Sequence, residues 1–223
     1  MVIFSFLGMS FAESVSPDRP TVSMSAKVLN PASGLFEFGV FGAGELTSPT
    51  LGMNALLRYG IGDGFEIRVD TAVDQHGDGL NLSPGVKWTA PKAMESLDLG
   101  VALHPVLPIG QDFAVKAAAL ANLGIESLSI SVNAGGLIVM AGPTSFTPQG
   151  SLVLGYALGG FSPFLEVSGS IEDEIHPAFG GGMIWSNAQL ALDFAAFYSP
   201  AHGVDSSPAY QGTIGCTYRF KGE

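Results

Sequence analysis

Residues Phe65–Val73 read FEIRVDTAV, and in this stretch apolar and charged side chains alternate. Successive side chains of a β-strand point to opposite faces of the sheet. One face therefore carries Phe65, Ile67, Val69, Thr71 and Val73, and the other carries Glu66, Arg68 and Asp70. A charge that faces lipid near the middle of a bilayer costs roughly 2–4 kcal/mol. In a membrane, the charged face of this strand must therefore point into a polar interior.

The same alternation recurs along the chain in stretches of about ten residues, which are separated by Gly, Pro, Asp, Asn and Ser. The predicted strands are Leu35–Glu45, Met53–Gly60, Phe65–Val73, Leu80–Thr89, Leu97–His104, Ala114–Gly124, Leu128–Met140, Gly150–Gly160, Phe164–Ile171, Phe179–Ser186, Gln189–Phe197 and Ala209–Phe220. The alternation predicts an all-β fold. The even number of strands favours a closed antiparallel up-and-down transmembrane β-barrel of about 12 strands. The alternative is a soluble two-sheet sandwich.

The predicted connections favour the barrel, because tight turns alternate with longer loops. Turns are expected at Ile61–Gly64, Ile125–Ser127 and Phe161–Pro163, and longer loops at Leu46–Gly52 and Glu172–Ala178, among others. Up-and-down insertion from the periplasm produces short periplasmic turns and longer outer loops. A Greek-key sandwich has no reason to alternate in this way.

Composition narrows the class of protein further. The 223 residues are 47% hydrophobic and only 13% charged, with a formal charge of −11. No segment approaches the roughly 18 uninterrupted apolar residues of a transmembrane helix. The negative charge repels phosphate backbones, so no nucleic-acid partner is expected. The single cysteine, Cys216, cannot form an intrachain disulfide.

The N-terminal region divides into two parts before the barrel. Residues 1–12 resemble the end of a truncated secretory signal peptide, because the apolar run Val2–Phe11 is followed by Ala12 and lacks a basic start. A buried first strand is the alternative. Residues 13–30 are expected to form an N-terminal periplasmic segment, and residues 31–223 the barrel.

When the pattern of Phe65–Val73 is extended to the other strands, nine charged residues point inward at one level of the periplasmic half. They are Glu37, Arg58, Glu66, Arg68, Lys87, Asp98, Glu166, Asp193 and Arg219. Such a layer is either a structural ion-pair network or a constriction that selects solutes by charge. At the same level outside, an aromatic girdle is expected from Tyr59, Trp88, Trp185 and Tyr218.

Beyond this layer the inward residues are small and neutral, for example Ala118, Ser151 and Ser168. They leave space for a narrow pore or a binding cavity, and the sequence does not decide between an open and a filled lumen. Two residues break the pattern. Pro84 removes an N–H from a strand, which predicts a bulge, and Leu120 is apolar at an inward position.

Several short motifs resemble the outer-membrane transporter family named for the meta-pathway of phenol degradation. Leu56–Arg68 (LLRYGIGDGFEIR) resembles its L-R-Y-G strand end, tight turn and E-L-R strand start. Leu82–Trp88, Leu107–Gly110 and Thr217–Phe220 resemble further segments of that family, although Ile109 stands where the family has threonine. The resemblance implies an outer-membrane barrel for hydrophobic or aromatic compounds, and it supplies no catalytic residues.

The sequence therefore predicts a passive channel or uptake protein for small solutes in the outer membrane of a Gram-negative bacterium. Its expected partners are outer-membrane lipid and lipopolysaccharide, the barrel assembly machinery and a small-molecule solute. No catalytic residue, metal or cofactor is predicted; the four histidines are interpreted as residues of solvated outer loops. Two alternatives remain: a lipid hydrolase that uses Ser199 or Ser206 beside His202, and a structural or adhesive barrel without transport.

Overall fold

The computed structural model describes residues 18, 23–45, 48–76, 81–91, 94–108, 113–140, 142–201 and 207–221. Twelve strands make up most of this part of the chain. They are β1 (Ser33–Glu45), β2 (Ser48–Gly62), β3 (Phe65–Asp74), β4 (Asn81–Thr89), β5 (Leu97–Pro108), β6 (Phe113–Ile125), β7 (Leu128–Met140), β8 (Ser145–Tyr156), β9 (Phe161–Ile171), β10 (Ile175–Ser186), β11 (Leu190–Ser199) and β12 (Ala209–Lys221).

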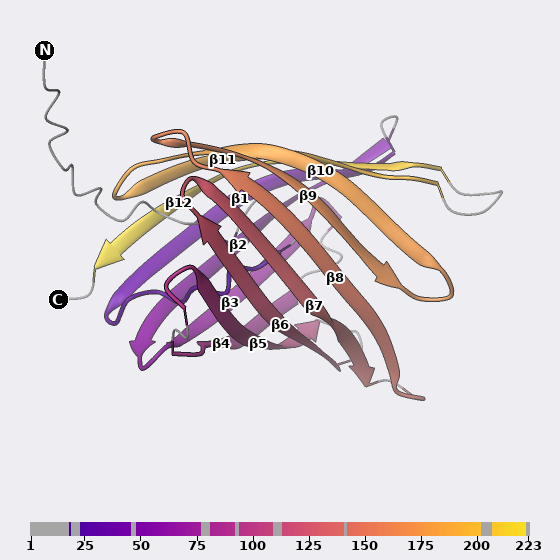
Figure 1. The fold of residues 1–223 in the computed structure, drawn as a ribbon. Coiled ribbons are helices and arrows are strands. Elements are labelled where there is room, and N and C mark those ends of the chain that lie inside the picture. Colours follow the sequence, from indigo (N-terminus) through magenta and orange to yellow (C-terminus); the bar gives the residue numbers. More distant parts are fainter. Residues whose placement is uncertain are drawn as a thin grey trace, which may run out of the picture.

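Each strand pairs antiparallel with its neighbours in sequence, and β1 pairs with β12, so the sheet closes into a barrel (Figure 1). The closing register runs from Ser33 opposite Lys221 to Gly44 opposite Tyr210. Within the described residues no helix is long and apolar enough to cross a membrane. The predicted fold class and the number of strands are confirmed; the sandwich alternative is wrong.

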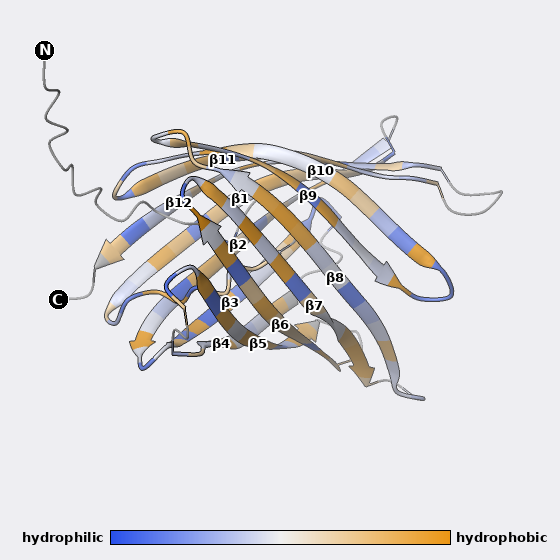
Figure 2. Cartoon of the chain, viewed as in Figure 1, coloured by the Kyte–Doolittle hydropathy of each residue, from blue (hydrophilic) through white to orange (hydrophobic). Residues whose placement is uncertain are grey.

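The two faces of the wall differ as the alternation predicts. On β3, Glu66 and Arg68 are buried at 0% and 4% exposure, whereas Ile67 between them is 48% exposed. Coloured by hydropathy, several strands change from apolar to polar and back along their length (Figure 2). Because the exposed large side chains are apolar in strand after strand, the outer surface of the barrel is apolar.

Several strands are longer than predicted. The predicted alternation of tight turns and longer loops is therefore less regular in the structure. β2 begins at Ser48, inside the predicted loop Leu46–Gly52, and β10 begins at Ile175, inside the predicted loop Glu172–Ala178. The predicted turn Phe161–Pro163 lies in β9, and the chain turns instead at 157–160, where Gly159 has φ +62°. Small polar residues are typical of turns, but here they also cover the inner face of a barrel.

The ladder between β4 and β5 is interrupted, although its register is unbroken. Paired positions stop after Leu82–Leu107 and resume at Val86–Leu103. At this register Pro84 and Pro105 lie opposite each other, and neither has an N–H to donate. The bulge expected at Pro84 is therefore a gap in pairing without a shift in register.

The fit of neighbouring strands predicts the effect of one glycine substitution. A Cβ at Gly135 on β7 would press against the Ala117 carbonyl oxygen and lie 2.7 Å from Ala118 Cα. Because both neighbours are backbone atoms, Gly135→Ala should destabilise the barrel by about 1–3 kcal/mol, measured by denaturant unfolding in detergent. Gly212→Ala on β12 is the control, since nothing lies within 4 Å of its Cβ. Equal stability of the two variants would contradict this account of the packing.

Candidate functional site: the barrel lumen

The lumen is crossed near the start of β1 by a buried ion cluster centred on Arg58 of β2. The Arg58 guanidinium bonds the Glu66 carboxylate of β3 through Nε at 2.9 Å and through Nη2 at 3.0 Å. Its Nη1 donates to Glu37 Oε1 of β1 at 3.2 Å. All three side chains are at most 2% exposed. This geometry joins three adjacent strands across the inner face.

The cluster also contains an acid from the N-terminal segment, which is not part of the barrel wall. Asp18 belongs to the N-terminal segment, and its carboxylate bonds Arg68 of β3 and lies 3.5 Å from both Arg58 Nη1 and Lys87 Nζ. Its own backbone N–H donates to Glu37 Oε1 at 3.3 Å. Asp18 is therefore held by side chains of three strands of the wall.

Charge balance explains why an acid from the segment is bound here. Among the described wall residues, Arg58, Arg68 and Lys87 form ion pairs within 4.0 Å with the carboxylates of Glu37 and Glu66. Asp18 supplies the third negative charge, so three cations meet three acids. Burial by itself raises the pKa of the Asp18 carboxyl, but the neighbouring Arg58, Lys87 and Arg68 outweigh it and hold that pKa well below its usual range.

The segment Ser23–Asn30 continues along the inner wall through hydrogen bonds of its backbone. Ser23 N–H donates to Glu166 Oε1 at 3.0 Å, and Ala26 N–H to Asn122 Oδ1 at 2.9 Å. Leu29 N–H donates to Glu66 Oε2 at 3.0 Å. The described residues of the expected periplasmic segment 13–30 thus lie against the inside of the barrel, and they occupy its lumen at the level of the ion cluster.

Apolar contacts explain the inward residue that breaks the sequence pattern. Leu120 on β6 is 3% exposed and packs with Ala102 and with Ala26 of the segment. Leu35 on β1, also inward and fully buried, packs with Ala191 and Leu29. At these two places the segment therefore rests on apolar residues of the inner face.

The remaining predicted lumen residues lie on the inner face around this cluster. Asp98 reaches Lys27 of the segment at 4.0 Å, and Glu166 also accepts a hydrogen bond from Ser23 Oγ at 3.0 Å. Asp193 is buried and Arg219 is half-buried. Of the predicted girdle, Trp88 stacks at a tilt on Phe65 with ring centroids 6.4 Å apart, and Tyr218 is exposed on the outer face. Tyr59 and Trp185 are half-buried.

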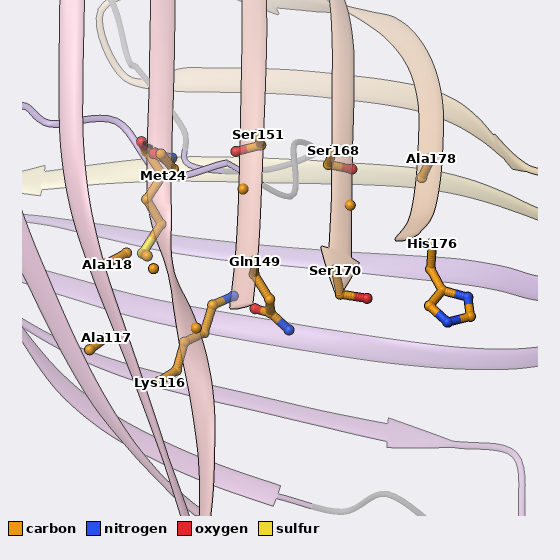
Figure 3. Close-up of a pocket in the computed structure, with 15 residues that line it drawn as sticks. Met24, Lys116, Ala117, Ala118, Gln149, Ser151, Ser168, Ser170, His176 and Ala178 are labelled. Carbon is orange, nitrogen blue, oxygen red and sulfur yellow. Dashed lines mark hydrogen bonds between the residues drawn. The ribbon is translucent and has the colours of Figure 1, made fainter. Parts of the chain in front are cut away.

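Beyond the cluster, toward the ends of β3 and β5, the lumen contains two cavities that share Met24 and Lys116. The larger cavity, of about 300 Å³, is lined by polar side chains of five strands, β6 to β10; Lys116, Gln149 and His176 line it among small residues (Figure 3). The smaller, of about 180 Å³, lies between Asp18 and β2 to β6. Small lumen residues therefore leave space, as the sequence predicts.

Three residues of the lumen were not assigned to a site from the sequence. Asp18 carries no periodic signal, because it precedes the first strand. From the sequence, His104 is interpreted as a residue of an outer loop, but it lies in β5 and is 5% exposed. An even number of positions separates it from Asp98 and Ala102, so the alternation of β5 places all three on the inner face. Lys116 follows the inward pattern but lies above the predicted layer. Among the described residues no group of His, Cys, Asp and Glu side chains could hold a metal ion.

A closed antiparallel barrel with an apolar outer face and a charged lumen has the fold of outer-membrane porins. No family model and no curated protein matches the sequence. Solved structures that share the fold include the NanC porin (TM-score 0.64, 10% identity, 81% of this chain and 98% of that chain). A KdgM porin in complex with disordered oligogalacturonate has TM-score 0.69 at 8% identity, over 83% and 99% of the two chains. The COG4313 outer membrane channel from Pseudomonas putida F1 has TM-score 0.59 at 12% identity, over 92% and 100%.

The ion cluster predicts how the segment responds to a single change of charge. Asp18→Asn leaves three buried cations against two acids, and breaking a buried pair in this way costs about 3–5 kcal/mol. The segment should then leave the wall, so a cysteine at Ser23, which is 5% exposed, should react faster with a water-soluble thiol reagent in a Cys216→Ser background. Asp63→Asn in the exposed β2–β3 turn is the control. Unchanged reactivity in Asp18→Asn would contradict this role of Asp18.

Acid should release the segment from the wall as Asp18→Asn does, because it neutralises the Asp18 carboxylate. Because the pKa of Asp18 is lowered in the folded protein, its stabilisation is complete above the ordinary carboxyl value of about 3.9 and is lost as the pH falls below it. Because the thiolate that reacts becomes scarce in acid, the reactivity of the Ser23 cysteine is divided at each pH by that of a cysteine placed at the exposed Asp63. This ratio should stay low from pH 8 to about pH 5 and rise as the pH drops below about 4. A rise near neutral pH would contradict the lowered pKa.

Proposed function

We propose that this protein is a passive channel in the bacterial outer membrane for small solutes. One observation carries the proposal: beyond the ion cluster, small neutral side chains leave two cavities inside a closed barrel whose outer face is apolar. The ion cluster supports the interpretation as a structural network, because its charges are paired with one another and anchor the segment.

Solute size should be limited by the N-terminal segment. Its residues 23–30 lie on the inner wall and bond to β3, β4, β6, β7 and β9, so they take up cross-section that an open porin would leave to water. In this proposal a solute passes through the space beside the segment, and displacement of the segment widens the path.

The proposed position of the barrel in the outer membrane follows from the difference between the two faces of its wall. The apolar outer face would contact lipid and lipopolysaccharide, and the ends of the chain would lie on the periplasmic side, as in other single-chain outer-membrane barrels inserted by the assembly machinery. The resemblance of Leu56–Arg68 to the phenol-degradation transporters adds hydrophobic and aromatic compounds to the candidate solutes. The hydrolase alternative depends on His202 with either Ser199, at the end of β11, or Ser206; His202 and Ser206 lie outside the described residues. We propose that the protein is not an enzyme.

Proteoliposome swelling tests the channel directly. Vesicles that contain the full chain should admit glycerol and other small solutes and exclude larger sugars, because the segment narrows the lumen. Asp18→Asn should raise the rate of entry and the size limit, whereas Asp63→Asn should leave both unchanged. Absence of entry by every solute in both wild type and Asp18→Asn would overturn the proposal in favour of a structural or adhesive barrel.

A further inference from the structure

We infer that the smaller lumen cavity is a binding site for a short organic carboxylate. The cavity holds about 180 Å³ and is bounded by Asp18, Ser23 and Met24 of the segment and by the inner faces of β2 to β6. The inference rests on the proposed channel function only for the route by which the ligand arrives, because binding itself requires the cavity alone.

Two deeply buried side-chain nitrogen atoms at this cavity have no hydrogen-bond partner among the described residues: Arg68 Nε, which is a donor, and His104 Nε2, which donates in one of the two tautomers of the neutral ring. The two side chains are 4% and 5% exposed. Both residues line the same cavity. A buried polar group that stays without a hydrogen bond costs about 1–3 kcal/mol. A ligand that accepts hydrogen bonds from both atoms removes this cost and therefore binds more tightly.

The strands bring these groups together by a close fit. A Cβ at Gly85 would lie 2.5 Å from His104 Nδ1, so the glycine allows the imidazole to lie against the β4 backbone. Gly85 is in turn the paired neighbour of Arg68 across β3 and β4. The guanidinium and the imidazole therefore approach the cavity from strands on either side of β4.

Lys116 adds an ammonium group at the same place, beside the guanidinium of Arg68 and the imidazole of His104. It pairs directly with His104 across β5 and β6 and lines both cavities. Its ammonium makes no hydrogen bond or ion pair within 4.0 Å to another residue of the described chain. Guanidinium, imidazole and ammonium together offer several donors, which is the arrangement that the lone pairs of a carboxylate accept.

Two carboxylates also line the cavity and limit this attraction. The oxygens of Asp18 are engaged by Arg58, Arg68 and Lys87. Asp70 on β3 interacts electrostatically with Lys116, so it opposes a bound anion. Removal of the Asp70 charge should therefore strengthen the binding of a carboxylate, which gives the inference a second, independent readout.

The apolar residues that line the cavity indicate which carboxylic acid would fit it. Met24, Leu56 and Val106 add apolar side chains to the lining, which suits a short alkyl chain. At about 30 Å³ for each water, the cavity has the room of a few solvent molecules. A monocarboxylate of three or four carbons has the matching size and the matching division into a charged head and an apolar body.

Calorimetry on the full chain in detergent tests the inference with butyrate and with butyramide, which has the same shape without the charge. Butyrate should bind about tenfold more tightly than butyramide, a difference of about 1.4 kcal/mol. Lys116→Gln should weaken butyrate binding about tenfold, whereas Lys27→Gln, which removes a lumen charge outside the cavity, should leave it unchanged. Asp70→Asn should strengthen it severalfold.

Equal binding of butyrate and butyramide, or equal loss in Lys116→Gln and Lys27→Gln, would overturn the carboxylate site. The absence of any heat with butyrate, in wild type and in Asp70→Asn, would do the same and leave a cavity filled by solvent only. Proteoliposome swelling separates this failure from that of the channel. Swelling without butyrate binding counts against the site alone, and butyrate binding without swelling counts against the channel alone.

Discussion

The structure depends on a constraint that acts on every strand: one face of the wall must be apolar and the other must hold the charges. Closing twelve strands into a ring turns all the charged faces toward the same enclosed space. There the charges cannot be solvated as at a surface, and buried charges are tolerated only when they are paired and hydrogen-bonded. The pairing of Arg58 with Glu37 and Glu66 on adjacent strands is the direct result.

This constraint also explains the position of the N-terminal segment. The wall residues of the cluster carry one more cation than they have acids, and Asp18 restores the balance. Backbone N–H groups of the segment then satisfy Glu66 and Glu166, and Ala26 covers Leu120. The ion cluster therefore determines how much of the lumen is filled near the start of β1. Toward the ends of β3 and β5 the small inner side chains leave the two cavities open.

Much of the fold could be predicted because alternation is a local property. The parity of Phe65–Val73, extended to other strands, predicts the inward direction of Glu37, Arg58 and Lys87, whose side chains are at most 2% exposed. The limits of β2 and β10 could not be predicted well, since small polar residues are typical both of loops and of a barrel interior. The contact of Asp18 with Arg68 joins residues 50 positions apart, and no periodic pattern encodes it. Leu120, an apolar residue at an inward position, was the available signal.

Spin labelling along β9 in liposomes tests the two-faced wall most directly. Single labels at Leu165, Val167, Ser168 and Ser170, in a Cys216→Ser background, report collision with oxygen dissolved in lipid and with a water-soluble nickel chelate. The account predicts high oxygen accessibility at Leu165 and Val167, which are 67% and 46% exposed, and low oxygen accessibility at Ser168 and Ser170. Uniform accessibility along the strand, or an inverted alternation, would contradict a barrel with an apolar exterior and a polar lumen.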